Sequence, residues 1–80
     1  PSVAGGRLPV VSGRRVVQVL QRAGFVIDRI VGSHHVMVYP GDPTRTVVVP
    51  VHAGRDLRPG TFRSILRQAG FSPEEFSKLL

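Results

Sequence analysis

The sequence predicts an α+β fold in which two helices cover one face of a three-stranded antiparallel sheet. Two segments toward the ends of the 80-residue chain carry apolar residues at helical spacing, and three short segments rich in β-branched residues lie between them. The connections between these three segments are too short for parallel crossovers, so neighbouring strands must run antiparallel. Both helices need an apolar surface to pack on, and the same side of the sheet provides it, which gives a two-layer sandwich.

Residues 12–25, SGRRVVQVLQRAGF, are expected to form the first helix. Ser12 is a suitable N-cap because its hydroxyl can accept a hydrogen bond from a backbone N–H of the first turn. Gly24 can take the left-handed conformation that follows a helix end. The apolar residues at positions i, i+3, i+4 and i+7 form one stripe and are Val16, Val19, Leu20 and Ala23.

Three strands are expected, at residues 25–31 (FVIDRIV), 34–39 (HHVMVY) and 45–51 (RTVVVPV). Gly32 and Ser33 break the first pair of strands, and the turn-forming sequence PGDPT breaks the second. Pro50 cannot donate a hydrogen bond to a neighbouring strand, so the third strand should be at an edge of the sheet or end at this residue.

Residues 59–71, PGTFRSILRQAGF, repeat the helical pattern and again end at a glycine followed by phenylalanine. The apolar stripe of this second helix is Phe62, Ile65, Leu66 and Ala69. A short third helix should follow, since Ser72 can cap it, Pro73 suits its first position and Glu75 stands at the capping-box position. We expect this helix to run to about Leu79.

Charge is the strongest signal in the composition. There are 11 basic and 5 acidic residues, and Lys78 is the only basic residue that is not arginine. Arginine pairs with phosphate through a two-pronged fork, so a polyanion is the expected partner, with nucleic acid preferred over a membrane. The chain has no cysteine and therefore no disulfide, for which a cytoplasmic setting is the default expectation.

The three histidines do not form a metal-binding motif. Without cysteine they supply too few ligands, and neither an H-x₃-H nor an H-E-x-x-H spacing occurs. We therefore expect no metal site and no cofactor.

The position of the histidines depends on the register of the second hairpin. If the turn PGDPT is symmetric, Tyr39 pairs with Arg45, which places His34 opposite Pro50 and makes His52 its diagonal neighbour. A one-residue slip would give that neighbourhood to His35 instead, and the apolar pattern does not decide between the two registers.

A pair of imidazoles near cationic side chains can cleave RNA, because one can accept the 2′-hydroxyl proton while the other protonates the leaving 5′-oxygen. Arginine would stabilise the charge that builds up on phosphorus. On spacing alone, however, a structural role is commoner for a histidine in a strand.

Several segments together resemble the HicA family, also described as YcfA-like, which is the toxin half of HicA–HicB toxin–antitoxin systems. They are SGRRVVQVLQRAGF, GSHHVMVYP and VVVPVHAGRDLRPGTFRSILRQAGFSPEEF, and they cover about residues 11–79. The resemblance implies a fold like that of double-stranded-RNA-binding domains, in α-β-β-β-α order. It also implies an endoribonuclease that acts on mRNA without a required metal cofactor and slows growth until a HicB antitoxin occludes it.

The resemblance carries specific residues over to this chain. It assigns catalysis to His34, with Gly32 and Ser33 as the motif residues before it. It also matches His52 to a second histidine position, which the family motif holds less strictly. His35 falls at a variable position of the family. Two positions that are often basic in such proteins are Val31 and Val38 here, and residues 1–10 precede the family core as an expected flexible leader to a single domain over residues 11–80.

The leading hypothesis is therefore a toxin that cleaves RNA by acid–base catalysis at His34 and His52. Phosphate contacts are expected from arginines on the outer faces of the two long helices, namely Arg14, Arg15, Arg63 and Arg67. The alternative is a non-catalytic RNA-binding module with the same fold, in which the histidines are structural. A third interpretation, compatible with the first, is a basic surface that meets an acidic antitoxin.

Overall fold

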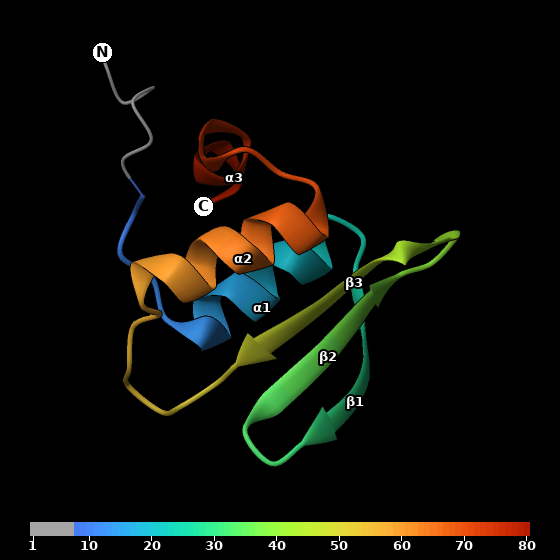
Figure 1. Ribbon diagram of the computed structural model, residues 1–80, viewed down its shortest axis with the longest axis horizontal. Coiled ribbons are helices and arrows are strands. Elements are labelled where there is room, and N and C mark those ends of the chain that lie inside the picture. Colours follow the sequence, from blue (N-terminus) through green and yellow to red (C-terminus); the bar gives the residue numbers. More distant parts are fainter. Residues whose placement is uncertain (1–7) are drawn as a thin grey trace.

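The computed structural model describes residues 8–80 as one sheet with helices on a single side (Figure 1). Along the chain the elements are α1 (Gly13–Arg22), β1 (Val26–Val31), β2 (His34–Tyr39), β3 (Asp42–Pro50), α2 (Pro59–Ala69) and α3 (Pro73–Leu79). The strands are antiparallel in the order β1-β2-β3. The predicted α-β-β-β-α sandwich with a short C-terminal helix is confirmed.

The helix ends form as their residues predict. The Ser12 hydroxyl accepts a hydrogen bond of 3.1 Å from the Arg15 backbone N–H at the start of α1. A complete capping box between Ser72 and Glu75 starts α3. Gly70 ends α2 in the left-handed conformation with φ 84°, so the chain can turn sharply between the two helices.

The core lies between the sheet and the two long helices. Met37, Val47 and Val49 point toward the helices and are fully buried. The helices contribute residues from the two predicted apolar stripes, which are Val16, Val19, Leu20, Phe62, Ile65, Leu66 and Ala69. Phe25 and Phe76 are also fully buried or nearly so. Burying a Val, Leu, Ile, Met or Phe side chain contributes about 1.5–3 kcal/mol, so this core is a main source of stability for a domain of this size.

The register of the β2–β3 hairpin is as predicted over most of its length. His34 pairs with Pro50, and the pairing continues in step to Val38 opposite Thr46. The predicted pairing of Tyr39 with Arg45 is wrong, because the register shifts there and Tyr39 instead faces Asp42.

The physical reason for this shift is a tighter turn followed by a bulge. β3 begins at Asp42, directly after Gly41, whose φ of 92° lets the chain reverse within a short turn. Residues 43–45 then have no partner in β2. The Asp42 carboxylate accepts a hydrogen bond of 3.2 Å from the Thr44 N–H, which holds the bulge by local side-chain bonding.

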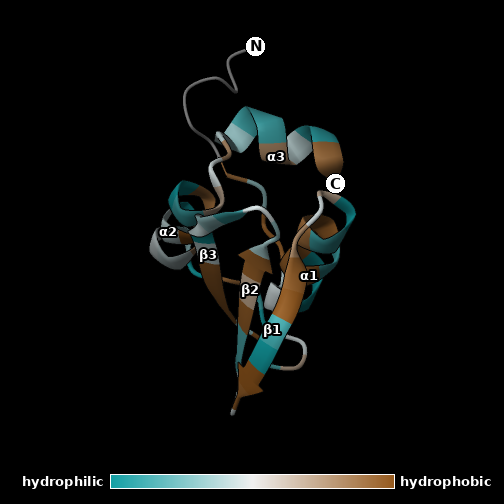
Figure 2. Ribbon diagram, turned by 90° about the vertical axis from the view of Figure 1, so that its right-hand side faces the viewer, coloured by the Kyte–Doolittle hydropathy of each residue, from teal (hydrophilic) through white to brown (hydrophobic). Residues whose placement is uncertain are grey.

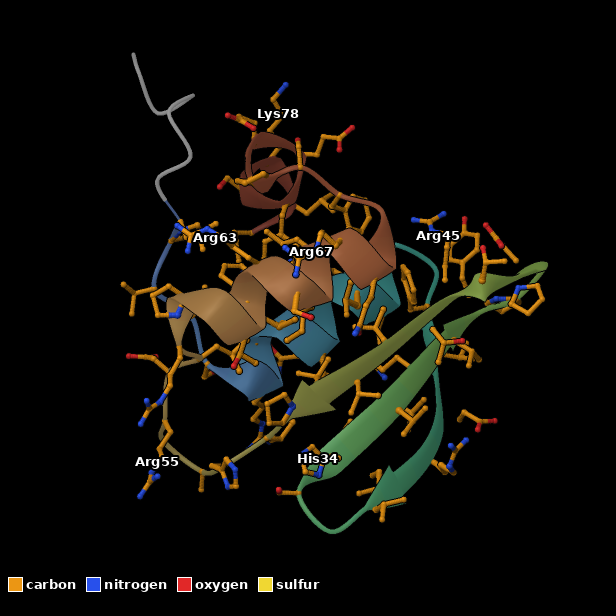
Figure 3. The ribbon with its side chains drawn as sticks, viewed as in Figure 1. His34, Arg45, Arg55, Arg63, Arg67 and Lys78 are labelled. Atoms are coloured by element: carbon orange, nitrogen blue, oxygen red, sulfur yellow. The ribbon has the colours of Figure 1, made fainter. Side chains whose placement is uncertain are left out.

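The bulge also places Arg45 over a group of aromatic rings. Its guanidinium carbon lies 4.3 Å from the centroid of the Tyr39 ring, 5.2 Å from that of Phe25 and 5.7 Å from that of Phe71. The Arg45 Nε–H also donates a hydrogen bond of 2.9 Å to the carbonyl oxygen of Ala69. A single side chain thus ties the hairpin to the end of α2 (Figure 3).

The opposite face of the sheet carries no helix. Strand pairing puts Val31, His34 and Pro50 in one row of this open face. Val31 is 59% exposed, and Val48 in the next row is 42% exposed. Figure 2 shows hydrophobic, brown segments along the strands, interrupted by a hydrophilic, teal stretch of β1. An apolar surface of this kind often marks an interaction site.

Two other expectations concern the N-terminal leader and membrane-spanning helices. Residues 1–7 of the predicted leader lie outside the described residues; after them, Leu8 packs partly against the core and Val10 is exposed. Within residues 8–80, no helix is both long enough and apolar enough to cross a membrane.

Gly13→Ala should destabilise the protein, because the added methyl group would overlap the carbonyl oxygen of Pro50 where α1 starts against the end of β3. We expect a loss of about 2 kcal/mol in the free energy of unfolding, typical of overpacking, measured by urea denaturation. Gly60→Ala is the matched control, since a methyl group in the first turn of α2 meets no atom within 4 Å. It should gain about 0.5 kcal/mol, and equal effects of the two substitutions would contradict the close packing at Gly13.

Arg45→Ala should also destabilise the protein, by about 2 kcal/mol, through loss of the ring contacts and of the hydrogen bond to Ala69. Arg45→Lys keeps the charge but not the flat fork, so its loss should fall between alanine and wild type. Urea denaturation of both variants, with the exposed Arg67→Ala as control, measures this difference. Arg45→Ala with wild-type stability would show that the stacked arginine contributes nothing.

Candidate histidine and arginine site

His34 and His52 lie at the same end of the sheet. The Val51 N–H donates a hydrogen bond of 2.7 Å to the Ser33 carbonyl oxygen, so the residues that precede the two histidines are bonded directly to each other. His52 itself lies just beyond β3, in a turn that the Arg55 N–H closes on the His52 carbonyl at 3.0 Å. Both histidines are exposed, so their rings are open to a ligand.

The His52 turn carries two arginines that the sequence analysis did not select. Arg55 and Arg58 line a shallow depression with His52, together with Pro50, Asp56, Leu57 and Thr61. The signal was present in the sequence, because HAGRDLRPG places both arginines within six residues of the histidine. Figure 3 shows Arg55 at the same end of the molecule as His34.

The loop with His52 is fixed at its far end as well. The Leu57 N–H donates a hydrogen bond of 2.8 Å to the Val11 carbonyl oxygen, and Asp56 forms an isolated bridge with Ser12. The start of α1 therefore holds the loop in place. Between the two tethers, Gly54 has a φ of 71°, which allows the chain to turn.

His35 occupies a different setting from His34. Its strand partner is Val49 of the core, so its side chain is on the face that carries the helices. There it lines an open groove of about 370 Å³ with Arg14, Val17, Gln18, Gln21 and Val51. Its Nδ1 atom is buried and has no hydrogen-bond partner among the described residues. His35 was expected to be at a variable position of the family, and no pattern in the sequence predicted this groove.

The four arginines predicted to contact phosphate do not gather around His34. Arg14 lines the groove of His35. Arg63 and Arg67 are on α2, beside an apolar depression that includes Phe71, and Figure 3 shows them well away from His34. Arg15 is on α1, half-buried beside the N-cap.

Within residues 8–80, the cationic side chains are nearly all without acidic partners. The one ion pair in this part of the chain joins Arg29 to Asp28 at 2.6 Å. No group of three or more histidine, aspartate or glutamate side chains in the same range is placed to hold a metal ion. The free guanidinium groups create a positive field that favours a polyanionic ligand.

The fold and the site define a small basic α+β protein with exposed histidines where the sheet meets a tethered, arginine-bearing loop. The family model described as "HicA toxin of bacterial toxin-antitoxin" matches residues 13–71, and the chain belongs to this family. The matched region runs from the first residue of α1 past the end of α2 and includes all three histidines. A comparison with curated proteins found no match. The protein is thus a toxin whose partner is an antitoxin.

Proposed function

We propose that this toxin is an endoribonuclease that cleaves mRNA by histidine acid–base catalysis and so inhibits translation in the cytoplasm. The observation that supports it most directly is the Val51–Ser33 hydrogen bond, which holds the strand ends of His34 and His52 together inside the HicA match. The substrate would be single-stranded RNA, because a reacting phosphate needs a free 2′-hydroxyl that can align with it.

The proposed reaction is an internal transesterification. One histidine removes the proton of a 2′-hydroxyl, whose oxygen attacks the adjacent phosphorus, and the bond from phosphorus to the 5′-oxygen breaks. The other histidine protonates that leaving 5′-oxygen, so the products are a 2′,3′-cyclic phosphate and a 5′-hydroxyl. His34 and His52 are the proposed pair, with Gly32 and Ser33 forming the turn that positions His34. Proton transfer of this kind is worth about 10²–10⁴-fold in rate.

Arginine has a separate role in this proposal. Arg55 and Arg58 share the depression of His52, so they are the nearest cations for the charge that develops on phosphorus. Arg14, Arg15, Arg63 and Arg67 would contact phosphates farther along the RNA. These outer contacts would add affinity without choosing a sequence.

The proposed antitoxin is a HicB-like protein with an acidic surface. Opposite charge would speed its association with a toxin of net charge +6. The exposed valines of the open face, next to His34, provide an apolar centre for such an interface. An antitoxin bound there would cover the proposed catalytic residue.

The second candidate function is a non-catalytic RNA-binding module, and the position of His34 on an open apolar face is the observation that favours it. In that case RNA binding would be salt-sensitive but no product would form. Cleavage by purified protein separates the two functions.

His34→Ala should lower the rate of RNA cleavage at least about a hundredfold, because it removes one proton-transfer group. His52→Ala should lower it by about tenfold or more, and His35→Ala should leave the rate at saturating protein concentration unchanged, because His35 transfers no proton. The measurement is single-turnover cleavage of a long single-stranded RNA in excess EDTA, with circular dichroism to check that each variant is folded.

The two neighbouring histidines serve as controls for each other. Equal cleavage by wild type and His34→Ala, or loss of cleavage only in His35→Ala, would show that His34 is not the catalyst. RNA binding by the wild type without any product would replace the proposed nuclease with the binding module.

Arg55→Ala should weaken RNA binding and reduce the slope of log K against log salt by about one, as expected for the loss of one phosphate contact. Fluorescence anisotropy of a labelled RNA over a series of salt concentrations measures this slope. Lys78→Ala in α3 is the control, because it removes one charge on an element far from the His52 depression (Figure 3). Equal changes in slope for the two variants would show that only net charge matters.

A further inference from the structure

The groove beside His35 has the lining of a small-ligand site. Arg14, Gln18 and Gln21 stand at positions i, i+4 and i+7 of α1, so all three side chains lie along one face of the helix. Val17 and Val51 complete the lining with apolar surface. The volume of about 370 Å³ is in the range of pockets that hold small molecules, which is about 300–1,000 Å³.

The His35 ring forms part of the wall of this groove. Its Nδ1 atom is buried, yet it has no protein partner within residues 8–80. An atom this deeply buried is out of reach of a ligand in the groove, so the face of the imidazole ring, and not Nδ1, is what His35 offers there. A flat imidazole at the wall of a groove offers a surface on which a nucleobase can stack.

The other side chains select the kind of ligand. A glutamine amide presents one acceptor and a pair of donors side by side, which matches the amino group and the adjacent ring nitrogen of adenine or cytosine. Of these two bases, adenine has the larger ring system to stack on the His35 imidazole. The Arg14 guanidinium matches a phosphate. None of the six lining residues is acidic, so an anionic ligand meets no repulsion there.

We propose that this groove binds one adenine nucleotide of a single-stranded RNA. Gln18 and Gln21 contact the base edge, His35 stacks on the base through its ring, and Arg14 holds the phosphate. This assignment rests on the proposed RNA substrate, and it makes the groove the source of sequence preference. The catalytic step stays with the histidines at the end of the sheet.

The test is an NMR titration of the ¹⁵N-labelled full chain with adenosine, guanosine, cytidine and uridine 3′-monophosphates. Adenosine monophosphate should produce saturable shifts of the amides of residues 14–21 and of the His35 imidazole, at lower concentrations than the other three nucleotides. Gln18→Ala and Gln21→Ala should each weaken adenosine binding about tenfold and remove the base preference, which is the effect expected for one amide–base contact.

Two further variants control for fold and location. Gln68→Ala removes the same side chain from α2, outside the groove, and should leave the titration unchanged. Gln18→Glu keeps the shape of the side chain but loses its donor and adds a negative charge, so it should abolish binding while changing the spectrum of the free protein only near residue 18.

The titration needs no turnover, so it is repeated on the His34→Ala variant. Adenosine binding by His34→Ala would show that the groove works without catalysis, and adenosine binding by a wild type that yields no RNA product would support this site while the proposed nuclease fails. Equal binding of the four nucleotides, absence of saturable shifts in the groove, or shifts gathered at Arg55 and Arg58 would overturn the adenine site, whatever the cleavage assay shows.

Discussion

Burial of the β2–β3 apolar residues under the two helices is the constraint on which the rest of this structure depends. Met37, Val47 and Val49 are fully buried, and the register that buries them also pairs His34 with Pro50. Since side chains alternate between the two faces of a strand, a slip of one residue would expose this core and exchange the faces of His34 and His35. The placement of each histidine is therefore enforced by core residues that are buried from solvent.

The same packing extends to the loop that carries His52. Gly13 lets the first turn of α1 approach the Pro50 carbonyl, and the bond from Leu57 to Val11 fastens the loop to the chain just before that helix. The loop is thus held at both ends and exposed in between, which suits a segment that must present charged side chains in a defined place. A domain of this size has a small core, so the contacts that fasten the loop also contribute to its stability.

The sequence is informative where a local rule decides the structure. Both long helices follow from their apolar stripes, and their ends follow from Ser12, Gly24 and Gly70, because capping depends on residues within one turn. The short third helix was predictable for the same reason. Each of these features is set by near neighbours along the chain.

The sequence is less informative where distant residues decide. The PGDPT segment has the composition of a long turn, but the hairpin closes at Gly41 and the following residues form a bulge. That bulge is stabilised by Arg45, whose partners Phe25 and Phe71 are far away along the chain. The groove of His35 could not be predicted from the sequence either, because it is formed by residues of α1 together with residues of the sheet side. No spacing within a single segment describes such a groove.

The two adjacent histidines give this small domain two chemically different surfaces. His34 lies on the open face, whereas His35 lies on the helix side, in the groove with Arg14. An RNA chain bound as proposed at both places would have to cross the end of the sheet at the turn formed by Gly32 and Ser33. Gly32 is exposed, and a methyl group added there would meet no atom within 4 Å, so this part of the turn is open to solvent. A partner bound at this end of the sheet would then block base recognition and cleavage at the same time. A single interface would therefore be enough for an antitoxin to inhibit the toxin.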